Sequence, residues 1–268
     1  MRIALGIEYD GTAFQGWQRQ HGVRTVQQEI EQALSRVADH AVSVSCAGRT
    51  DSGVHALYQV AHFETHAERS ARSWVLGANT NLPDDVSVSW ARPVPPRFHA
   101  RFSATSRLYH YLICNREARP GVWHGRVSWE CRALDCERMQ QAARHWLGEH
   151  DFSSFRAQAC QARHPVRTVH QCTVAERDGL IVVTVEANAF LHHMVRNFAG
   201  VLMQIGRGQH EPDWAREVLE YRARERGGVT APPHGLYLGA VRYPPEFDLP
   251  PPPSTIPILA AYAGRAWG

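Results

Sequence analysis

The chain of 268 residues contains no lysine, so arginine supplies all 29 of its basic side chains. Mechanisms that need a lysine amine, such as Schiff-base chemistry and the P-loop contact with a nucleotide phosphate, are therefore excluded. The guanidinium groups suit phosphates and base edges, although a genome rich in arginine codons explains most of these positions more simply. Because the net charge is only +3, any nucleic-acid surface must come from local clustering.

Metal and nucleotide signatures are also missing. None of the six cysteines has a C-x-x-C partner, and we expect reduced, buried and inert thiols rather than a zinc site. The G-x-G-x-x-G, Walker, H-E-x-x-H and G-x-S-x-G motifs are absent. The sequence therefore gives no support to a nucleotide cofactor, a metal or a serine nucleophile.

Long apolar runs are absent too, and no uncharged stretch reaches the length that spans a bilayer. Glu8 and Asp10 lie where an export signal would need apolar residues. We expect a cytoplasmic protein that does not bind membranes.

Hydrophobic periodicity predicts the order βαββαβ twice. In the first half we expect strands at residues 3–9, 42–46, 56–63 and 86–90, and helices at 25–38 and 72–78. In the second half we expect strands at 107–115, 166–176, 180–187 and 236–243, and helices from 135, at 190–205 and near 212. The pattern predicts an α+β fold of two ferredoxin-like halves.

Local signals refine this scheme. Thr25 and Gln28 have capping-box spacing, Asp135 is a candidate N-cap, and Asp178-Gly179 predicts a hairpin. The expected divisions are residues 1–104, residues 105–248 and a proline-rich tail at 249–268, whose prolines 250–253 predict an extended, peripheral segment.

Residues 48–55, Gly-Arg-Thr-Asp-Ser-Gly-Val-His, form the first segment that could carry chemistry. Its two glycines allow a sharp turn between two strands, and Arg49 and Asp51 could both face a ligand there. On spacing alone, an ordinary polar turn is the favoured interpretation.

A second segment is strongly basic, since residues 97–126 hold six arginines against one acid, Glu117. Guanidinium groups interleaved with aromatic rings are typical of RNA-binding surfaces. A half-buried strand is the alternative, which we prefer for Tyr111; for Arg101 and Tyr109 both interpretations stay open.

The third segment, residues 188–197, lies where a strand gives way to a helix whose first amides favour an anion. Arg196 falls within the first two helical turns. Adjacent histidines on a helix diverge, so His192 and His193 are a poor metal chelate, and a structural or RNA-facing role is favoured.

Together these segments resemble the tRNA pseudouridine synthase A family. The matching stretches occur in family order at residues 9–12, 14–18, 25–27, 48–55, 98–102, 109–111, 151–155, 188–197 and 235–238. The resemblance implies an isomerase that needs neither metal nor cofactor and converts uridine to pseudouridine at positions 38, 39 and 40 in the anticodon stem-loop of tRNA. It also implies a homodimer, and a fold whose mainly antiparallel sheets join across a basic cleft.

The same resemblance assigns roles to residues. Asp51 becomes the nucleophile or base, Arg196 the cation paired with it, and Tyr109 the ring stacked on the uracil. Arg49 is implicated in base flipping. The expected RNA contacts are Tyr109, Arg49, Arg69, Phe98, His99, Ala100, Arg101 and Phe102. Ser52, where alanine is common, and Leu108 and His110, where basic residues are common, depart from the family pattern and bear on affinity rather than on the reaction.

The chemistry of these residue types fits the assignment. An ionised carboxylate can attack C1′ or deprotonate the ribose, and a nearby guanidinium keeps it ionised. An aromatic floor retains the freed uracil, and arginine contacts offset the few kcal/mol that base flipping costs. Two alternatives stay open: a non-catalytic RNA-binding protein of two RRM-like halves, and a hydrolase that uses Asp51 and His55.

Overall fold

The computed structural model describes residues 1–158, 160–177, 179–254 and 256. The chain divides into two compact units, one made of Met1–Thr105 with Tyr237–Ile256 and the other built on Ser106–Leu236. Both combine strands with helices, so the expected α+β class is confirmed. Over the described ranges, no helix is long and apolar enough to cross a membrane.

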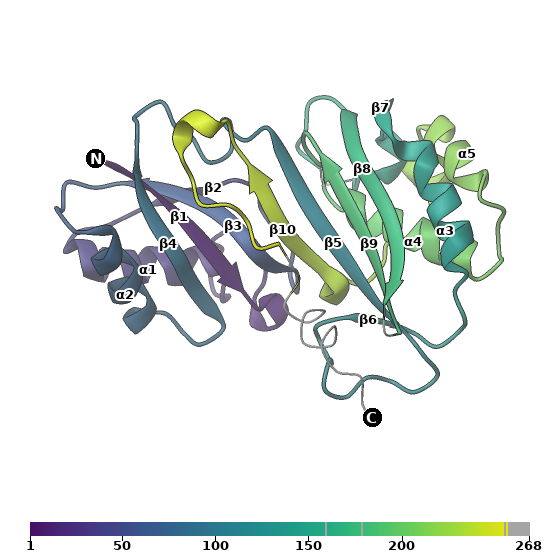
Figure 1. Cartoon of the computed structure of the whole chain (residues 1–268), viewed down its shortest axis with the longest axis horizontal. Coiled ribbons are helices and arrows are strands. Elements are labelled where there is room, and N and C mark those ends of the chain that lie inside the picture. The colour runs from purple at the N-terminus through teal and green to yellow at the C-terminus, as the bar shows by residue number, and fades with distance from the viewer. Residues whose placement is uncertain (159, 178, 255, 257–268) are drawn as a thin grey trace. The chain divides into compact units, whose positions relative to one another are not determined.

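The first unit is a sheet with two helices (Figure 1). Its strands run in the order β4-β1-β3-β10, with β2 beside β3. Strands β1 and β3, β1 and β4, and β2 and β3 pair in antiparallel fashion, whereas β10 pairs with β3 in parallel, which brings residues 237–256 into this unit. The strands are β1 (Arg2–Tyr9), β2 (Val44–Cys46), β3 (His55–Glu64), β4 (Val86–Val94) and β10 (Leu236–Arg242), and the helices are α1 (Val26–Ala38) and α2 (Ala71–Asn81).

The core of this unit lies between the sheet and the two helices. Trp74 of α2 is fully buried and packs edge-on against Phe63 of β3, with ring centroids 5.1 Å apart. Gly77 of α2 lies so close to α1 that a Cβ there would come within 2.9 Å of the Val37 side chain. The apolar spacing that predicted these helices therefore marks their buried faces.

The start of α1 differs from the sequence-based expectation. The Thr25 side chain is buried, and its hydroxyl has no hydrogen-bond partner among the described residues, so the predicted capping box is wrong. The backbone carbonyls of Gly16 and Trp17 accept instead from the amides of Val26 and Gln27, at 3.2 and 3.0 Å. A segment that precedes the helix thus occupies the place of the side-chain cap.

The second unit also has helices against a sheet, with strand order β5-β9-β8-β7 and β6 beside β5. A stacked aromatic pair, Trp146 and Phe198, lies in its core with centroids 4.2 Å apart. The strands are β5 (Ser106–Asn115), β6 (Ser128–Glu130), β7 (Gly148–Asp151), β8 (Val166–Arg177) and β9 (Leu180–Ala187), and the helices are α3 (Cys136–Ala143), α4 (Met194–Gly206) and α5 (Trp214–Tyr221).

Of two helix starts predicted in this unit, one is confirmed and the other lies further along the chain. The Asp135 carboxylate accepts a hydrogen bond from the Arg138 amide at 3.0 Å, which confirms it as the N-cap of α3. Helix α4 begins at Met194 rather than near residue 190, because His193 adopts a left-handed conformation with φ of 64°. The short strands β6 and β7 were not predicted. Of the predicted hairpin, Asp178 lies outside the described residues.

The beginning of the proline-rich tail packs against the first unit. The Tyr58 hydroxyl donates to the Pro250 carbonyl, and Ile256 is buried. The remainder of the tail, from residue 257, lies outside the described residues, so its predicted peripheral position stays a prediction.

Candidate active-site residues

Asp51 lies on the loop between β2 and β3, here called the Asp51 loop (residues 48–54). The carboxylate-bearing residue is half-buried. Its neighbour Thr50 is fixed from two sides: its side chain shares a 2.8 Å hydrogen bond with the Tyr9 hydroxyl, and its carbonyl accepts from the Trp17 amide at 3.0 Å. The backbone on one side of Asp51 is therefore held by a separate segment of the chain.

The same segment, residues 9–17, holds the other end of the loop. The Phe14 carbonyl accepts from the Gly53 amide at 3.3 Å and from the Ser52 hydroxyl at 3.2 Å. Gly16 has φ of 87°, and a Cβ there would lie 2.6 Å from the Thr50 carbonyl oxygen. Close backbone approach on both sides therefore fixes where Asp51 is presented.

His55, the partner in the hydrolase hypothesis, is engaged in this scaffold. It is buried, its Nδ1 accepts from the Gly11 amide at 3.0 Å, and its ring stacks on Tyr237 with centroids 4.6 Å apart. These contacts tie β3, β10 and the turn after β1 together, which is a structural role.

The arginine–aromatic loop (residues 95–103) contains five of the expected RNA contacts. The side chains of Phe98 and Ala100 are 0% exposed, and the Tyr243 hydroxyl donates to the Ala100 carbonyl at 2.6 Å. Phe102, by contrast, is 76% exposed, and the guanidinium of exposed Arg101 lies 5.5 Å from its ring centroid. Phe98 and Ala100 thus anchor the loop, while Arg101 and Phe102 face the solvent.

Two imidazoles support this loop from within. His62 of β3 is buried, and burial lowers its pKa to about 4, with further contributions from His99 and Arg2. The pKa of His99 is also lowered, first by partial burial and then by the charges of Arg2 and Arg101. Both side chains are therefore neutral at physiological pH.

Tyr109 and Tyr111 lie on the same strand, β5, with different surroundings. Tyr109 is 8% exposed, and its ring meets Phe190 edge-on at 5.0 Å. Tyr111 is fully buried and donates its hydroxyl to the Pro232 carbonyl at 2.8 Å, which confirms the expected core role. The Tyr109 ring thus lies beside Phe190, in the segment that leads to α4.

Arg196 lies in the first turn of α4 and is half-buried. Its Nε donates to the Ala231 carbonyl at 2.9 Å, while its own carbonyl accepts from the Ala231 amide at 3.1 Å. This reciprocal pair orients the guanidinium within its unit. The next residue, Asn197, is buried and donates to the Phe155 carbonyl at 2.7 Å, a structural role that the sequence did not reveal.

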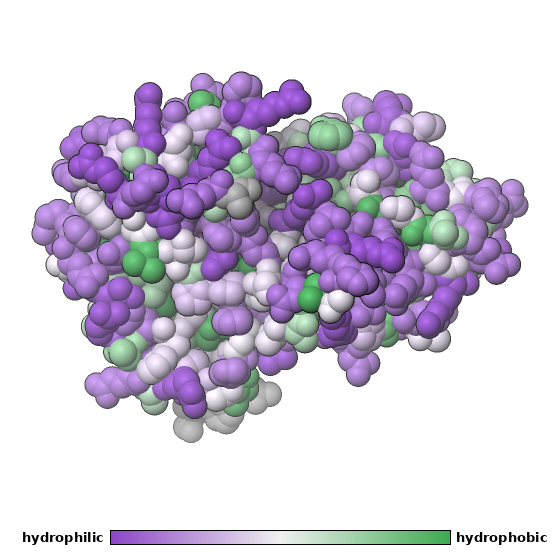
Figure 2. Space-filling view, turned by 180° about the vertical axis from the view of Figure 1, so that it is seen from behind, coloured by the Kyte–Doolittle hydropathy of each residue, from purple (hydrophilic) through white to green (hydrophobic). Residues whose placement is uncertain are grey.

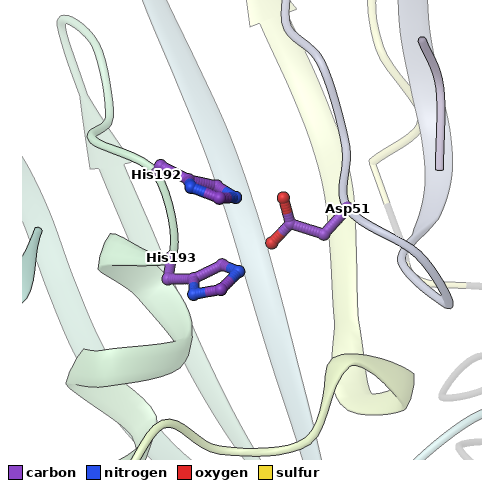
Figure 3. Close-up of side chains that lie close together, drawn as sticks. All are labelled: Asp51, His192 and His193. Atoms are coloured by element: carbon purple, nitrogen blue, oxygen red, sulfur yellow. The ribbon is translucent and has the colours of Figure 1, made fainter. Parts of the chain in front are cut away.

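His192 and His193 lie on the turn that precedes α4, and Asp51 lies on its loop in the first unit (Figure 3). The centroids of the two imidazole rings lie 4.0 Å apart, and the ring planes make an angle of 43°. Because His193 has the left-handed backbone of a cap, the pair belongs to a turn rather than to a helix. Two adjacent imidazoles alone supply too few ligands for a closed zinc site.

The remaining expected contacts are surface arginines. Arg49 and Arg69 are both exposed, the first on the Asp51 loop and the second just before α2. Hydrophilic side chains cover most of the face seen in Figure 2, with apolar residues in small separate areas. All six cysteines are free, but only Cys114 and Cys172 are buried and Cys131 is exposed, so the expectation of buried thiols is wrong for the others. Burial raises the pKa of Cys46 and Cys172 to about 12, so no reactive thiolate forms there.

An exposed guanidinium beside an exposed aromatic ring is typical of surfaces that bind nucleic acids. The half-buried Asp51 adds a carboxylate, a group suited to nucleophilic or general-base chemistry, so the residues together define a nucleic-acid-modifying enzyme as the class to test. Comparison with known proteins narrows this class. A family model described as tRNA pseudouridine synthase matches residues 6–103 and 142–244. The chain belongs to the tRNA pseudouridine synthase family.

Curated relatives match nearly the whole chain. The tRNA pseudouridine synthase A of Methylococcus capsulatus is 58% identical over 249 residues, which are 93% of this chain and 92% of that protein. Those of Nitrosococcus oceani and Pseudomonas aeruginosa are 58% and 56% identical over 93% of this chain and 96% and 88% of their own lengths. A chain of a solved Cbf5-Nop10-Gar1 complex has a TM-score of 0.35 and 13% identity, with 75% of this chain and 45% of that chain covered, a likeness too low to carry an argument.

Proposed function

We propose that this protein converts uridine to pseudouridine at positions 38, 39 and 40 in the anticodon stem-loop of tRNA. Membership of the tRNA pseudouridine synthase family supports the reaction and the tRNA substrate. The target positions rest on the resemblance of the motif segments. A homodimer and a cytoplasmic location stay predictions from the sequence.

The observation that carries the mechanism is the scaffold around Asp51. The Tyr9–Thr50 and Trp17–Thr50 hydrogen bonds and the Phe14–Gly53 hydrogen bond hold both ends of the Asp51 loop. A carboxylate held in this way is suited to one geometry of attack on C1′, or of proton removal from C2′. In either case the C1′–N1 bond breaks, the uracil turns, a C1′–C5 bond forms, N1 gains a proton and C5 loses one.

Arg196 and Tyr109 complete the proposed chemistry. The Arg196 guanidinium, oriented by Ala231, serves as the cation that keeps Asp51 ionised during the reaction. The Tyr109 ring provides a floor for the detached uracil, and its contact with Phe190 holds the ring plane. Neither role needs a metal or a cofactor.

RNA binding is assigned to the exposed cationic and aromatic side chains. Arg49, Arg69, Arg101 and Phe102 are exposed and offer guanidinium groups to phosphates and a ring to an unpaired base. Phe98, His99 and Ala100 contribute through the shape of their loop. The strand order β4-β1-β3, with β2 beside β3, supports a ferredoxin-like first half, and we propose a second such half and a basic cleft between their sheets.

Mass spectrometry of tRNA incubated with the protein, before and after chemical tagging of pseudouridine, tests this proposal. We expect tagged nucleotides at positions 38, 39 and 40 and no change in mass before tagging. Lost bases would indicate a hydrolase instead. With Asp51→Ala we expect tRNA binding without tagged product, whereas retained product would overturn the assignment of Asp51.

A further inference from the structure

In the arginine–aromatic loop, side chains accept a hydrogen bond from each of the backbone amides of residues 99–102. Four consecutive N–H groups are involved, and each donates to a side chain rather than to a backbone carbonyl. The Ser103 hydroxyl accepts from the His99 amide at 2.9 Å, His62 Nδ1 from the Ala100 amide at 3.1 Å, and His99 Nδ1 from the amides of Arg101 and Phe102 at 3.1 and 3.4 Å.

These bonds require a particular state of both imidazoles. A ring nitrogen that accepts a hydrogen bond carries no proton, so Nδ1 is bare and the hydrogen of the neutral ring sits on Nε2. The surroundings favour this state on balance. Burial lowers the pKa of both histidines, their rings meet edge-to-face at 4.7 Å, and Arg2 from β1 and Arg101 from the loop repel a positive charge. In the opposite direction act Glu64 and a backbone hydrogen bond at Ser45 on His62, and a backbone hydrogen bond at residue 99 on His99.

One of these histidines also contacts the tip of the loop. The His99 ring packs on the Phe102 ring with centroids 4.3 Å apart, and the Arg101 guanidinium lies 5.5 Å from the centroid of the same Phe102 ring. The base of the loop is tied down separately, where Arg2 Nη1 donates to the Phe98 carbonyl at 2.6 Å. The imidazoles thus hold the amides of residues 100–102, whereas Arg2 holds the base of the loop.

We propose that His62 and His99 are positioning residues for RNA binding, whose neutral imidazoles hold the backbone of residues 100–102 so that Arg101 and Phe102 are presented together. The inference rests on the proposed function in one respect, namely that Arg101 and Phe102 contact the tRNA. It also limits how the loop can bind, because amides 99–102 are already engaged. The loop contacts RNA through the Arg101 guanidinium and the Phe102 ring, not through a backbone phosphate nest.

The first test is independent of RNA. Imidazole ¹⁵N chemical shifts report which nitrogen carries the hydrogen, and amide exchange reports the protection of residues 100–102. At pH 7 we expect the Nε2–H tautomer for both histidines and protected amides at Ala100, Arg101 and Phe102. An Nδ1–H tautomer or an imidazolium at pH 7 would overturn the proposal, whatever the substrate proves to be.

The second test compares two variants of the full-length protein. In His99→Asn the side-chain oxygen can take the place of Nδ1, whereas in His99→Gln the amide reaches toward the position of Nε2; both lose the ring. We expect His99→Gln to raise the KM for tRNA about tenfold above that of His99→Asn, since two amides lose their acceptor, with kcat within about twofold. Equal KM values for the two variants would contradict the proposal.

Arg101→Ala serves as the reference for direct contact. If it weakens tRNA binding while His99→Gln and His99→Asn behave alike, the contact stands and the positioning role fails. If Arg101→Ala leaves tRNA affinity unchanged although the imidazoles have the expected tautomers, the proposed RNA contact fails while the loop geometry stands. The two failures are thus distinguishable.

Discussion

The Asp51 loop and the arginine–aromatic loop belong to the same unit but are held in different ways. The hydrogen bonds to Thr50 and Gly53 come from backbone groups and one tyrosine hydroxyl, and glycines allow the close approach. The arginine–aromatic loop depends on two imidazole acceptors. Imidazoles titrate in the mildly acidic range, whereas the groups that bond to Thr50 and Gly53 do not. The hydrogen bonds at both ends of the Asp51 loop should therefore persist where those of the arginine–aromatic loop are lost.

The largest expected effect comes from adding one methyl group beside the Asp51 loop. In Gly16→Ala the new Cβ would lie 2.6 Å from the Thr50 carbonyl, at a residue whose φ is 87°. We expect kcat to fall about a hundredfold, because a small displacement of a reacting group has effects of that size. Steady-state kinetics on tRNA measure it.

Gly22→Ala is the matched control. Gly22 also has a positive φ, 77°, but a Cβ there has no neighbour within 4 Å. We expect a loss of about 1 kcal/mol in the free energy of unfolding and an unchanged kcat. If both variants lower kcat equally, backbone strain rather than contact with the Asp51 loop is the cause.

A smaller effect is expected from Tyr9→Phe, which removes the hydroxyl that bonds to Thr50 at 2.8 Å. We expect kcat to fall about tenfold at an unchanged KM for tRNA, and stability to fall by about 1–2 kcal/mol. Tyr58→Phe also removes a tyrosine hydroxyl bond of this unit, the one to Pro250, and should leave kcat unchanged. A loss of kcat in Tyr58→Phe as well would show that general loosening of the unit accounts for both.

The smallest effect at neutral pH, which grows on acidification, concerns His62. Its pKa is lowered from 6.5 to about 4 in the folded state, so between these values the unfolded chain binds a proton that the folded chain does not. Above about pH 6.5 this group therefore does not lower the free energy of unfolding. As the pH drops toward 4, it lowers the free energy of unfolding by up to about 3 kcal/mol. Chemical denaturation at several pH values measures the slope.

His110 of β5 provides a comparison in the other unit. Burial lowers its pKa to about 4 too, and its Nδ1 lies 3.0 Å from the Thr184 hydroxyl. His62→Asn and His110→Asn should each remove part of the acid-induced loss of stability. As the pH approaches 4, protonation of His62 removes the acceptor of the Ala100 amide, and we expect the KM for tRNA to rise. Only His62→Asn should remove part of this rise; an equal change in His110→Asn would contradict the distinction between the two loops.

Local signals in the sequence predicted local structure well. Asp135 caps α3 as expected, and the turn flanked by Gly48 and Gly53 lies between two strands. The prediction at Thr25 fails because the first amides of α1 donate to the backbone carbonyls of residues 16 and 17 rather than to a side chain. That outcome depends on tertiary packing, which a four-residue pattern does not contain.

The sequence predicted which residue types make up the candidate site, but not the hydrogen bonds that hold them in place. The Tyr9–Thr50 bond joins residues 41 positions apart, so nothing in the spacing of either segment indicates it. The structure gives a physical reason for the matching stretches within residues 9–18, because this segment forms the hydrogen bonds that hold the Asp51 loop. For Phe98 and Ala100, the resemblance implied contact, whereas their burial points to a role in shaping the loop.

Release of tritium from tRNA labelled as [5-³H]uridine tests the central claim most directly, because joining C5 to C1′ expels the hydrogen from C5. We expect the wild-type protein to release the label from positions 38, 39 and 40. Asp51→Asn, which keeps the shape of the side chain, should bind tRNA with unchanged affinity and release none. Release by Asp51→Asn at the wild-type rate would contradict the account.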